Sequence, residues 1–230
     1  MKAFAIIAVF LLTLVPLGAQ AQAPVQAQTP APAQTPAPAQ PVVQSQAGHE
    51  YSPLVEKTVN YKNWTLNTLK DNKPADLRSL MQGKKLVLVV YFAPWCPNWR
   101  NEAPVAARLY EKYKDQGFQV IGVSEYGTRD AVSAFFGPDG APYPVVSESE
   151  TRDDRDKTAH FGYRQLTGDT RKWGSPWNIF LEPAMVAKTG DVLTEKAWVV
   201  NGELIEADVD KFIADRLNTK TAAAIEPCKN

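Results

Sequence analysis

The sequence predicts an α/β domain in which a central mixed sheet is covered by helices on both faces. An unbroken apolar and β-branched run at 85–92 is typical of a strand buried on both sides. A helical pattern follows at once, and a second apolar run at 118–124 completes a strand–helix–strand crossover. Such a crossover packs helices on a sheet, so three layers, α/β/α, are expected.

The helix between these strands has a marked beginning and end. Pro97 suits a first helical turn, and Gly117 suits the residue that closes the element. The apolar stripe expected to face the sheet consists of Ala103, Ala106, Ala107 and Tyr110.

The remaining elements follow in order. A short helix is expected at 130–136 and an extended piece at 143–146. A run of mixed charge at 152–157 favours a solvated helix face over a docking patch. After a proline region at 173–181, the expected elements are a turn at 188–191, a strand at 193–200, a turn at 201–202 and an amphipathic helix at 207–217.

The N-terminus has the composition of a secretory signal. Lys2 precedes an uncharged apolar run at 3–15 and an A-x-A-like cleavage site, so 1–21 is interpreted as a signal peptide. The run is short for a bilayer core of about 30 Å, which disfavours a membrane span. We therefore expect an extracytoplasmic protein, periplasmic or secreted, with no membrane insertion after cleavage. A segment kept as an uncleaved anchor would leave the rest of the chain on the same side.

A disordered N-terminal tether is expected to precede the folded domain. Residues 22–49 are rich in Ala, Pro and Gln, and the six residues 28–33 recur as 34–39, which predicts a disordered spacer rather than a ligand for a proline-recognising domain. One domain at 50–218 and a tail at 219–230 with Cys228 complete the chain. The 25 basic and 25 acidic residues balance, so nothing steers the protein to nucleic acid.

Thiol chemistry is concentrated at 91–104, which reads Y-F-A-P-W-C-P-N-W-R-N-E-A-P. This segment fits the pattern F-W-A-x-W-C-P-x-C-[RK]-x-E-x-P through Cys96, Pro97, Arg100, Glu102 and Pro104. By these residues the chain resembles the TlpA/ResA-like extracytoplasmic thiol-disulfide oxidoreductases of the thioredoxin superfamily, over about 64–217. The resemblance implies a thioredoxin-like fold. The main departure is Trp99, which stands where that family has its second cysteine.

Cys96 is the expected nucleophile. A thiol at a helix N-terminus faces unpaired backbone N–H groups and the positive end of the helix dipole, which favours the thiolate, and Arg100 adds positive charge. The resemblance implies that Glu102 lies near the active site and tunes the acidity of the cysteine. A glutamate on a helix is also commonly exposed, so a solvent-facing Glu102 stays open.

The proline region supplies the second half of the expected site. Pro176 matches the family's cis-proline, which the resemblance places against the cysteine, with the Ser175 backbone free to pair with an extended substrate peptide. An ordinary trans-proline at a strand start is the alternative.

Three tryptophans are expected around Cys96. Trp95, Trp99 and Trp177 would form an exposed apolar collar suited to binding unfolded or extended peptide. The alternative is that one or two of these rings belong to the core.

The missing second cysteine leaves the resolving step open. Trp99 cannot expel a product, so a mixed disulfide at Cys96 would persist until another thiol attacks it. Cys228 is the only other cysteine; it is a possible resolving thiol, but also a possible free or partner-linked cysteine, or half of a simple structural disulfide.

These observations predict thiol-disulfide exchange through the single thiol of Cys96. The expected partners are cysteine-containing extracytoplasmic proteins or an upstream thiol reductant. A redox-silent peptide-binding module on the same fold is the alternative. Peroxiredoxin activity is disfavoured because Ala93 stands where that family has threonine, and a copper chaperone would need more than His160. No metal or cofactor is expected.

Overall fold

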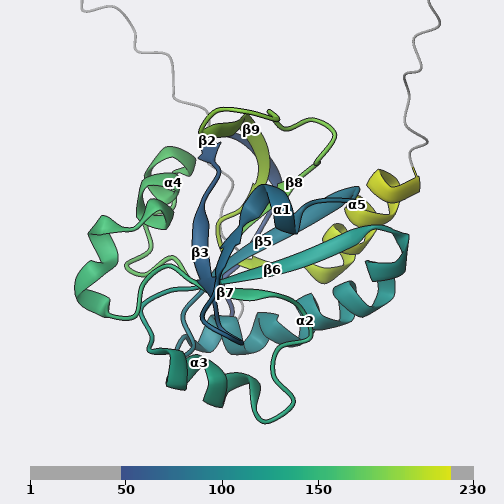
Figure 1. Cartoon of the computed structure of the whole chain (residues 1–230). Helices are drawn as coiled ribbons and strands as arrows, with labels where there is room; N and C mark the ends of the chain where they lie inside the picture. Colours follow the sequence, from purple (N-terminus) through teal and green to yellow (C-terminus); the bar gives the residue numbers. More distant parts are fainter. Residues whose placement is uncertain (1–47, 219–230) are drawn as a thin grey trace, which may run out of the picture. The chain divides into compact units, whose positions relative to one another are not determined.

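The computed structural model describes residues 48–218. Its main feature is an eight-stranded sheet in the order β2-β9-β8-β5-β6-β7-β3-β4, beside a two-stranded parallel pair of β1 and β10 (Figure 1). The strands are β1 (Tyr51–Ser52), β2 (Val55–Lys62), β3 (Thr65–Thr68), β4 (Pro74–Asp76), β5 (Leu86–Phe92), β6 (Phe118–Ser124), β7 (Val145–Ser147), β8 (Trp177–Leu181), β9 (Val192–Val200) and β10 (Glu203–Leu204).

The middle of the sheet is mixed in direction. Strand β5 runs parallel to β6 from Leu86↔Phe118 to Phe92↔Ser124 and antiparallel to β8. All seven residues of β5 and all seven of β6 are buried. Continuous apolar runs therefore form these strands, because both of their faces are covered.

Helices cover the sheet on both sides. They are α1 (Leu77–Leu80), α2 (Pro97–Tyr113), α3 (Arg129–Phe136), α4 (Ala159–Thr167) and α5 (Glu206–Asn218), with 3-10 turns η1 (Lys114–Gln116) and η2 (Arg152–Lys157). One core contains residues of α2, α3 and α5, and the other contains residues of α1 and α4 (Figure 1). Alternate residues of β5 belong to the two cores, Leu88 to the first and Val89 to the second. The three-layer, thioredoxin-like α/β/α fold with a central mixed sheet is confirmed.

Local sequence signals place the helix ends. Gly117 follows α2 and η1 with a left-handed φ of 101°, which a glycine adopts without steric penalty. The Thr128 side chain accepts a hydrogen bond from Ala131 N and Thr158 from Phe161 N, so hydroxyl caps begin α3 and α4.

Most expected elements lie within two residues of their observed bounds. The charged run forms η2 and is mostly exposed, as a solvated face should be. Elements that the sequence patterns did not predict include the edge strands β2 and β4, strand β3 next to β4, and the helices α1 and α4. The expected signal segment, most of the tether and the tail lie outside the described residues. Within 48–218 no helix is long and apolar enough to cross a membrane.

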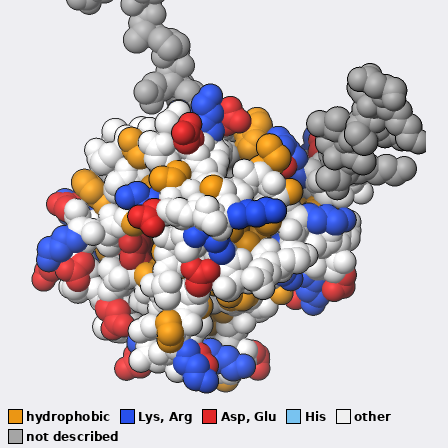
Figure 2. Space-filling model, turned by 45° about the horizontal axis from the view of Figure 1, so that its top comes forward, with side chains coloured by type: hydrophobic (Ala, Val, Ile, Leu, Met, Phe, Trp, Pro, Cys, Tyr) orange, Lys and Arg blue, Asp and Glu red, His pale blue; other side chains and the backbone are white. Residues whose placement is uncertain are grey.

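The surface carries charges of both signs. Figure 2 shows Lys and Arg side chains interspersed with Asp and Glu on the face in view, without a continuous field of one sign. This pattern agrees with the balanced composition of the chain.

Candidate functional site

Cys96 lies just beyond the C-terminal end of β5 and is the N-cap residue of α2. The first bond of the helix runs from Arg100 N to Cys96 O at 3.2 Å. Only 7% of Cys96 is exposed, and its Sγ donates to the Ser175 carbonyl oxygen at 3.1 Å. The thiol therefore occupies the expected helix terminus, with its hydrogen directed at a second loop.

That second loop carries Ser175 and Pro176. The Ser175–Pro176 peptide bond is cis, as expected, and both residues are buried. The Ser175 hydroxyl oxygen also accepts from Ala93 N at 2.8 Å. Two hydrogen bonds thus join the loop before β8 to the loop that enters α2, and the Ser175 carbonyl is engaged by the thiol.

The expectation of an exposed tryptophan collar around Cys96 is wrong for two of the three rings. Trp99 and Trp177 are both 0% exposed. The Trp99 ring stacks on Phe92 at 4.4 Å and lies 5.8 Å from Phe135, in the core beneath α2. Large apolar rings gain more from this burial than from lining a groove. Neither ring offers a surface to a substrate.

Trp177 lies in the opposite core. Its indole Nε1 donates to Asn201 Oδ1 at 2.9 Å, and its ring stacks with Tyr163 at 6.0 Å. Of the three rings, only that of Trp95 is half-buried, and its Nε1 donates to the Tyr126 carbonyl at 2.9 Å.

Glu102 is buried, so a solvent-facing glutamate is excluded. Only 1% of the residue is exposed, and Oε2 accepts from Leu204 N at 2.8 Å and from Asn178 Nδ2 at 3.1 Å. Oε1 has no partner within the described chain. Burial raises the pKa of Glu102 to about 8, although the two hydrogen bonds oppose the shift. Glu102 therefore holds α2 to β8 and β10 and titrates near neutral pH.

Arg100 lies on the exposed side of α2. Its guanidinium carbon is 5.7 Å from the centre of the Phe135 ring. The expected charge beside the thiol is thus placed over an aromatic ring one turn into the helix.

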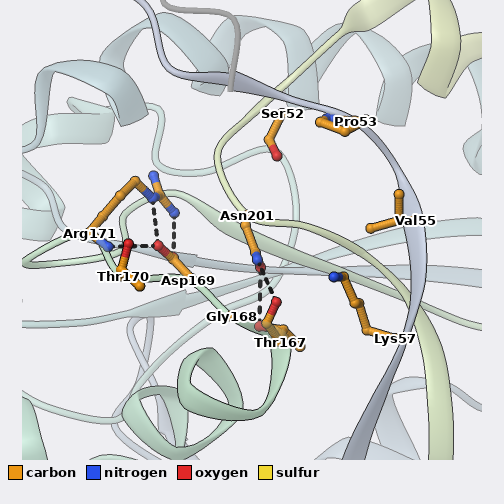
Figure 3. Close-up of a pocket in the computed structure, with 10 residues that line it drawn as sticks. All are labelled: Ser52, Pro53, Val55, Lys57, Thr167, Gly168, Asp169, Thr170, Arg171 and Asn201. Atoms are coloured by element: carbon orange, nitrogen blue, oxygen red, sulfur yellow. Dashed lines mark hydrogen bonds and ion pairs between the residues drawn. The ribbon is translucent and has the colours of Figure 1, made fainter. Parts of the chain in front are cut away.

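A buried ionic network that the sequence analysis missed holds the Ser175–Pro176 loop. Asp169 accepts from Arg171 through Nε at 2.9 Å and Nη2 at 2.7 Å, and from Arg164 Nε at 3.2 Å. The same Arg171 Nη2 donates to the Pro176 carbonyl at 2.8 Å. Both Asp169 and Arg164 are almost fully buried. Figure 3 shows the Arg171 side chain joined to Asp169 at a pocket of about 100 Å³ whose wall continues through Thr167 and Asn201.

Gly174 completes this loop. Its φ is 58°, and a Cβ built there would lie 1.7 Å from Arg164 Nε. The loop backbone passes so close to the guanidinium that only glycine fits. The acidic and basic residues around this glycine, all within 164–174, were the one sequence signal for the network.

A second polar cluster lies just beyond the C-terminal end of β6. Glu125 is fully buried, and the Ser149 hydroxyl donates to its Oε2 at 2.5 Å. Burial, together with the neighbouring Glu148, raises the pKa of Glu125 well above its ordinary value. Burial therefore favours the protonated form of this carboxyl group, which the Ser149 hydrogen bond opposes only in part.

His160 does not pair with the cysteine. Its Nδ1 lies 3.2 Å from the Tyr126 hydroxyl, and its ring stacks on Tyr91 at 5.0 Å. Burial and the nearby Arg164 hold the pKa of His160 well below its usual range, so it is neutral. No group of three or more His, Cys, Asp or Glu residues in 48–218 is arranged to hold a metal ion. Cys228 lies outside the described residues.

Comparison with protein families and curated proteins gives two directions of similarity. The AhpC/TSA family model matches residues 59–163. A probable phospholipid hydroperoxide glutathione peroxidase 6, mitochondrial, of Arabidopsis thaliana is 27% identical over 154 residues, which cover 64% of this chain and 66% of that protein, just under two thirds of its length. The thiol-disulfide oxidoreductase ResA of Oceanobacillus iheyensis is 32% identical over 65 residues, or 28% of this chain and 33% of that protein.

Similarity to solved structures is limited to TM-scores below 0.5 for the two described next. A thiol:disulfide interchange protein of the thioredoxin family from Chlorobium tepidum is 26% identical, with a TM-score of 0.49 over 68% of this chain and 94% of the other. A secreted Mycobacterium tuberculosis disulfide oxidoreductase homologous to DsbE of E. coli is 19% identical, with a TM-score of 0.47 over 66% of this chain and 95% of that one. The two curated relatives named above are a probable glutathione peroxidase and a thiol-disulfide oxidoreductase.

Proposed function

We propose that this protein performs thiol-disulfide exchange through the single thiol of Cys96. The observation that carries the proposal is the place of Cys96 at the start of α2, with its Sγ 3.1 Å from the Ser175 carbonyl beside a cis-proline. The motif match at 91–104 supports it.

The reaction needs the S–H···O bond to Ser175 to open first. The Cys96 thiolate then attacks one sulfur of a partner disulfide, a Cys96–partner bond forms, and the other partner sulfur leaves as a thiolate. A second thiolate attacks the partner sulfur of this mixed disulfide, which returns Cys96 to the thiolate and leaves a new disulfide on the partner side. The buried indole at position 99 has no thiol to do this, so an external thiol or Cys228 must act.

The proposed partners are extracytoplasmic proteins that carry a reactive cysteine, or an upstream thiol reductant. The location is proposed from the signal-like segment at 1–21. The half-buried Trp95 is the proposed contact with the partner chain, and the Ser175 carbonyl, buried and engaged by the thiol in this structure, would join it only after the S–H···O bond opens.

Peroxide reduction at the same thiol is the second candidate, favoured by the AhpC/TSA match at 59–163 and by the glutathione peroxidase relatives. Here the thiolate attacks a peroxide oxygen, the O–O bond breaks, an alcohol leaves after protonation, and Cys96 becomes a sulfenic acid. An external thiol then condenses with the sulfenic acid and releases water. Ala93 offers no hydroxyl to this reaction.

One experiment separates these reactions from a redox-silent binding module. The full chain and its Cys96→Ser and Cys228→Ser variants are mixed with an aromatic disulfide or with hydrogen peroxide plus a sulfenic-acid trap, and products are identified by mass spectrometry. Exchange predicts a mixed disulfide at Cys96 in the wild type and in Cys228→Ser. Trapped sulfenic acid, formed faster than the mixed disulfide, would favour peroxide reduction. If no adduct forms at Cys96 under either condition, both reactions are contradicted and the redox-silent binding module is favoured.

A further inference from the structure

Two indole rings lie together beside the proposed site. The rings of Trp95 and Trp173 are 5.3 Å apart in an edge-to-face arrangement, and both residues are half-buried. Trp95 directly precedes Cys96, and Trp173 stands two residues before Ser175, which accepts the Cys96 thiol hydrogen. A chain that reaches Cys96 from this side passes these rings.

Cations surround this pair of rings. The Arg152 guanidinium carbon lies 3.9 Å from the centre of the Trp95 ring and 5.6 Å from that of Trp173. Lys172 Nζ lies 5.4 Å and the Arg155 guanidinium carbon 5.7 Å from the Trp173 ring. Contact with the indole faces holds the cations in place while their N–H groups stay available.

Among residues 48–218, two of these three cations have no carboxylate partner. Arg155 pairs with Asp156 at 2.5 Å. Within the part of the chain that the structure describes, no ion pair is formed by Arg152 or by Lys172, and both side chains are exposed. Glu150 and Asp153 are near Arg152 in the chain, but neither forms an ion pair with it.

The contrast with neighbouring cations makes this arrangement specific. Lys157, in the same turn η2, pairs with Asp154 at 3.0 Å, and Arg171, next to Lys172, pairs with the buried Asp169. Of the three cations that contact the indoles, Arg155 is paired with Asp156, whereas Arg152 and Lys172 form no ion pair within residues 48–218.

We propose that Trp95, Trp173, Arg152 and Lys172 form a docking surface for a partner segment that carries carboxylate side chains next to its reactive cysteine. This inference rests on the proposed exchange function and names its substrate class. An extended segment would lay its apolar atoms on the indoles and direct carboxylates to the two cations, because charge-assisted hydrogen bonds to guanidinium are strong and directional.

The test measures exchange rates with model peptides. The full chain reacts with three disulfide-linked peptides whose cysteine is flanked by Glu, by Gln or by Lys, at low and at high salt. We expect the Glu peptide to react about 1.4- to 5-fold faster per engaged cation than the Gln peptide at low salt, and the Lys peptide to be slowest, since an exposed charge pair is worth roughly 0.2–1 kcal/mol. High salt should reduce the difference.

Three variants identify the source of the preference. Arg152→Gln and Lys172→Gln should each reduce it, and Arg152→Lys should restore part of it. Lys157→Gln is the matched control, because this lysine already has its carboxylate and contacts neither ring; its preference should equal that of the wild type. Equal rates for the Glu and Gln peptides, or a preference that survives both glutamine variants, would overturn the docking surface while the exchange function stands. Failure of all three peptides to react at Cys96 would overturn both.

Discussion

The two loops that meet at Cys96 are held by different forces. The segment 93–96 follows a fully buried strand and enters a helix whose Trp99 and Phe92 rings stack in the core. The loop 168–176 instead depends on a carboxylate shared by two arginines and on a glycine that fits against one of them. Apolar packing thus places the thiol, whereas buried charge places the carbonyl that receives its hydrogen. The predictions below test this division.

The largest effect is expected from Trp99→Ala. Removing a fully buried indole leaves a cavity beneath α2, which should lower the free energy of unfolding by about 3–5 kcal/mol, measured by denaturant titration.

A Trp99→Cys variant creates a similar cavity but also places a second thiol one turn from Cys96, where a disulfide can form. That variant should oxidise internally and reduce a model disulfide with an added dithiol. A folded Trp99→Cys protein with two free thiols would show that the first turn of α2 differs from that of the dithiol proteins it resembles.

Asp169→Asn should come next, at about 3 kcal/mol of lost stability, because it leaves the buried Arg164 guanidinium without its charge partner and Arg171 with only Glu50. The Ser175 loop should also loosen, so Cys96 should alkylate faster at neutral pH as its carbonyl contact weakens. Asp210→Asn is the control, since Asp210 pairs with Lys112 on the exposed side of α2 and should change stability by less than about 1 kcal/mol. If the Asp169→Asn protein is destabilised but its alkylation rate is unchanged, the ionic network does not control the contact between Cys96 and the Ser175 carbonyl.

Glu102→Gln tests a polar contact of α2, the helix whose position depends mainly on apolar packing. The pKa of Glu102 is about 8 in the folded protein against an ordinary value of 4.5, so the folded state binds the proton more tightly than the unfolded state. Its contribution to stability is therefore complete below about pH 4.5 and is lost as pH rises through about 8. The Gln variant should remove this loss, about 1 kcal/mol per pH unit in that interval. Parallel pH–stability curves for the two proteins would mean that Glu102 is ionised in the fold.

The smallest effect is expected from Arg100→Ala. Its guanidinium is exposed over the Phe135 ring, a contact worth about 0.5–1 kcal/mol. The alkylation rate of Cys96 should change little, because the structure directs this charge at the ring. A large decrease in that rate would show that Arg100 does favour the Cys96 thiolate, as first expected from its position one turn after the cysteine.

The sequence by itself determined the fold and the place of the thiol. Strands β5 and β6 are continuous apolar runs, and Pro97 begins α2. These signals are local, since each depends on the periodicity or the backbone chemistry of a few neighbouring residues. The cis-proline and a place for Glu102 near the active site were instead expected from the family resemblance, and a role of Glu102 in tuning Cys96 stays a prediction.

Only the tertiary structure decided which side chains are buried and what they contact. Trp99 and Trp95 have the same side chain, four residues apart, yet one fills the core and the other contacts a surface arginine. The bonds from Asn178 and Leu204 to Glu102 join residues 76 and 102 positions apart. Burial and long-range polar contacts depend on which elements pack together across the sheet, and local sequence patterns do not predict that packing.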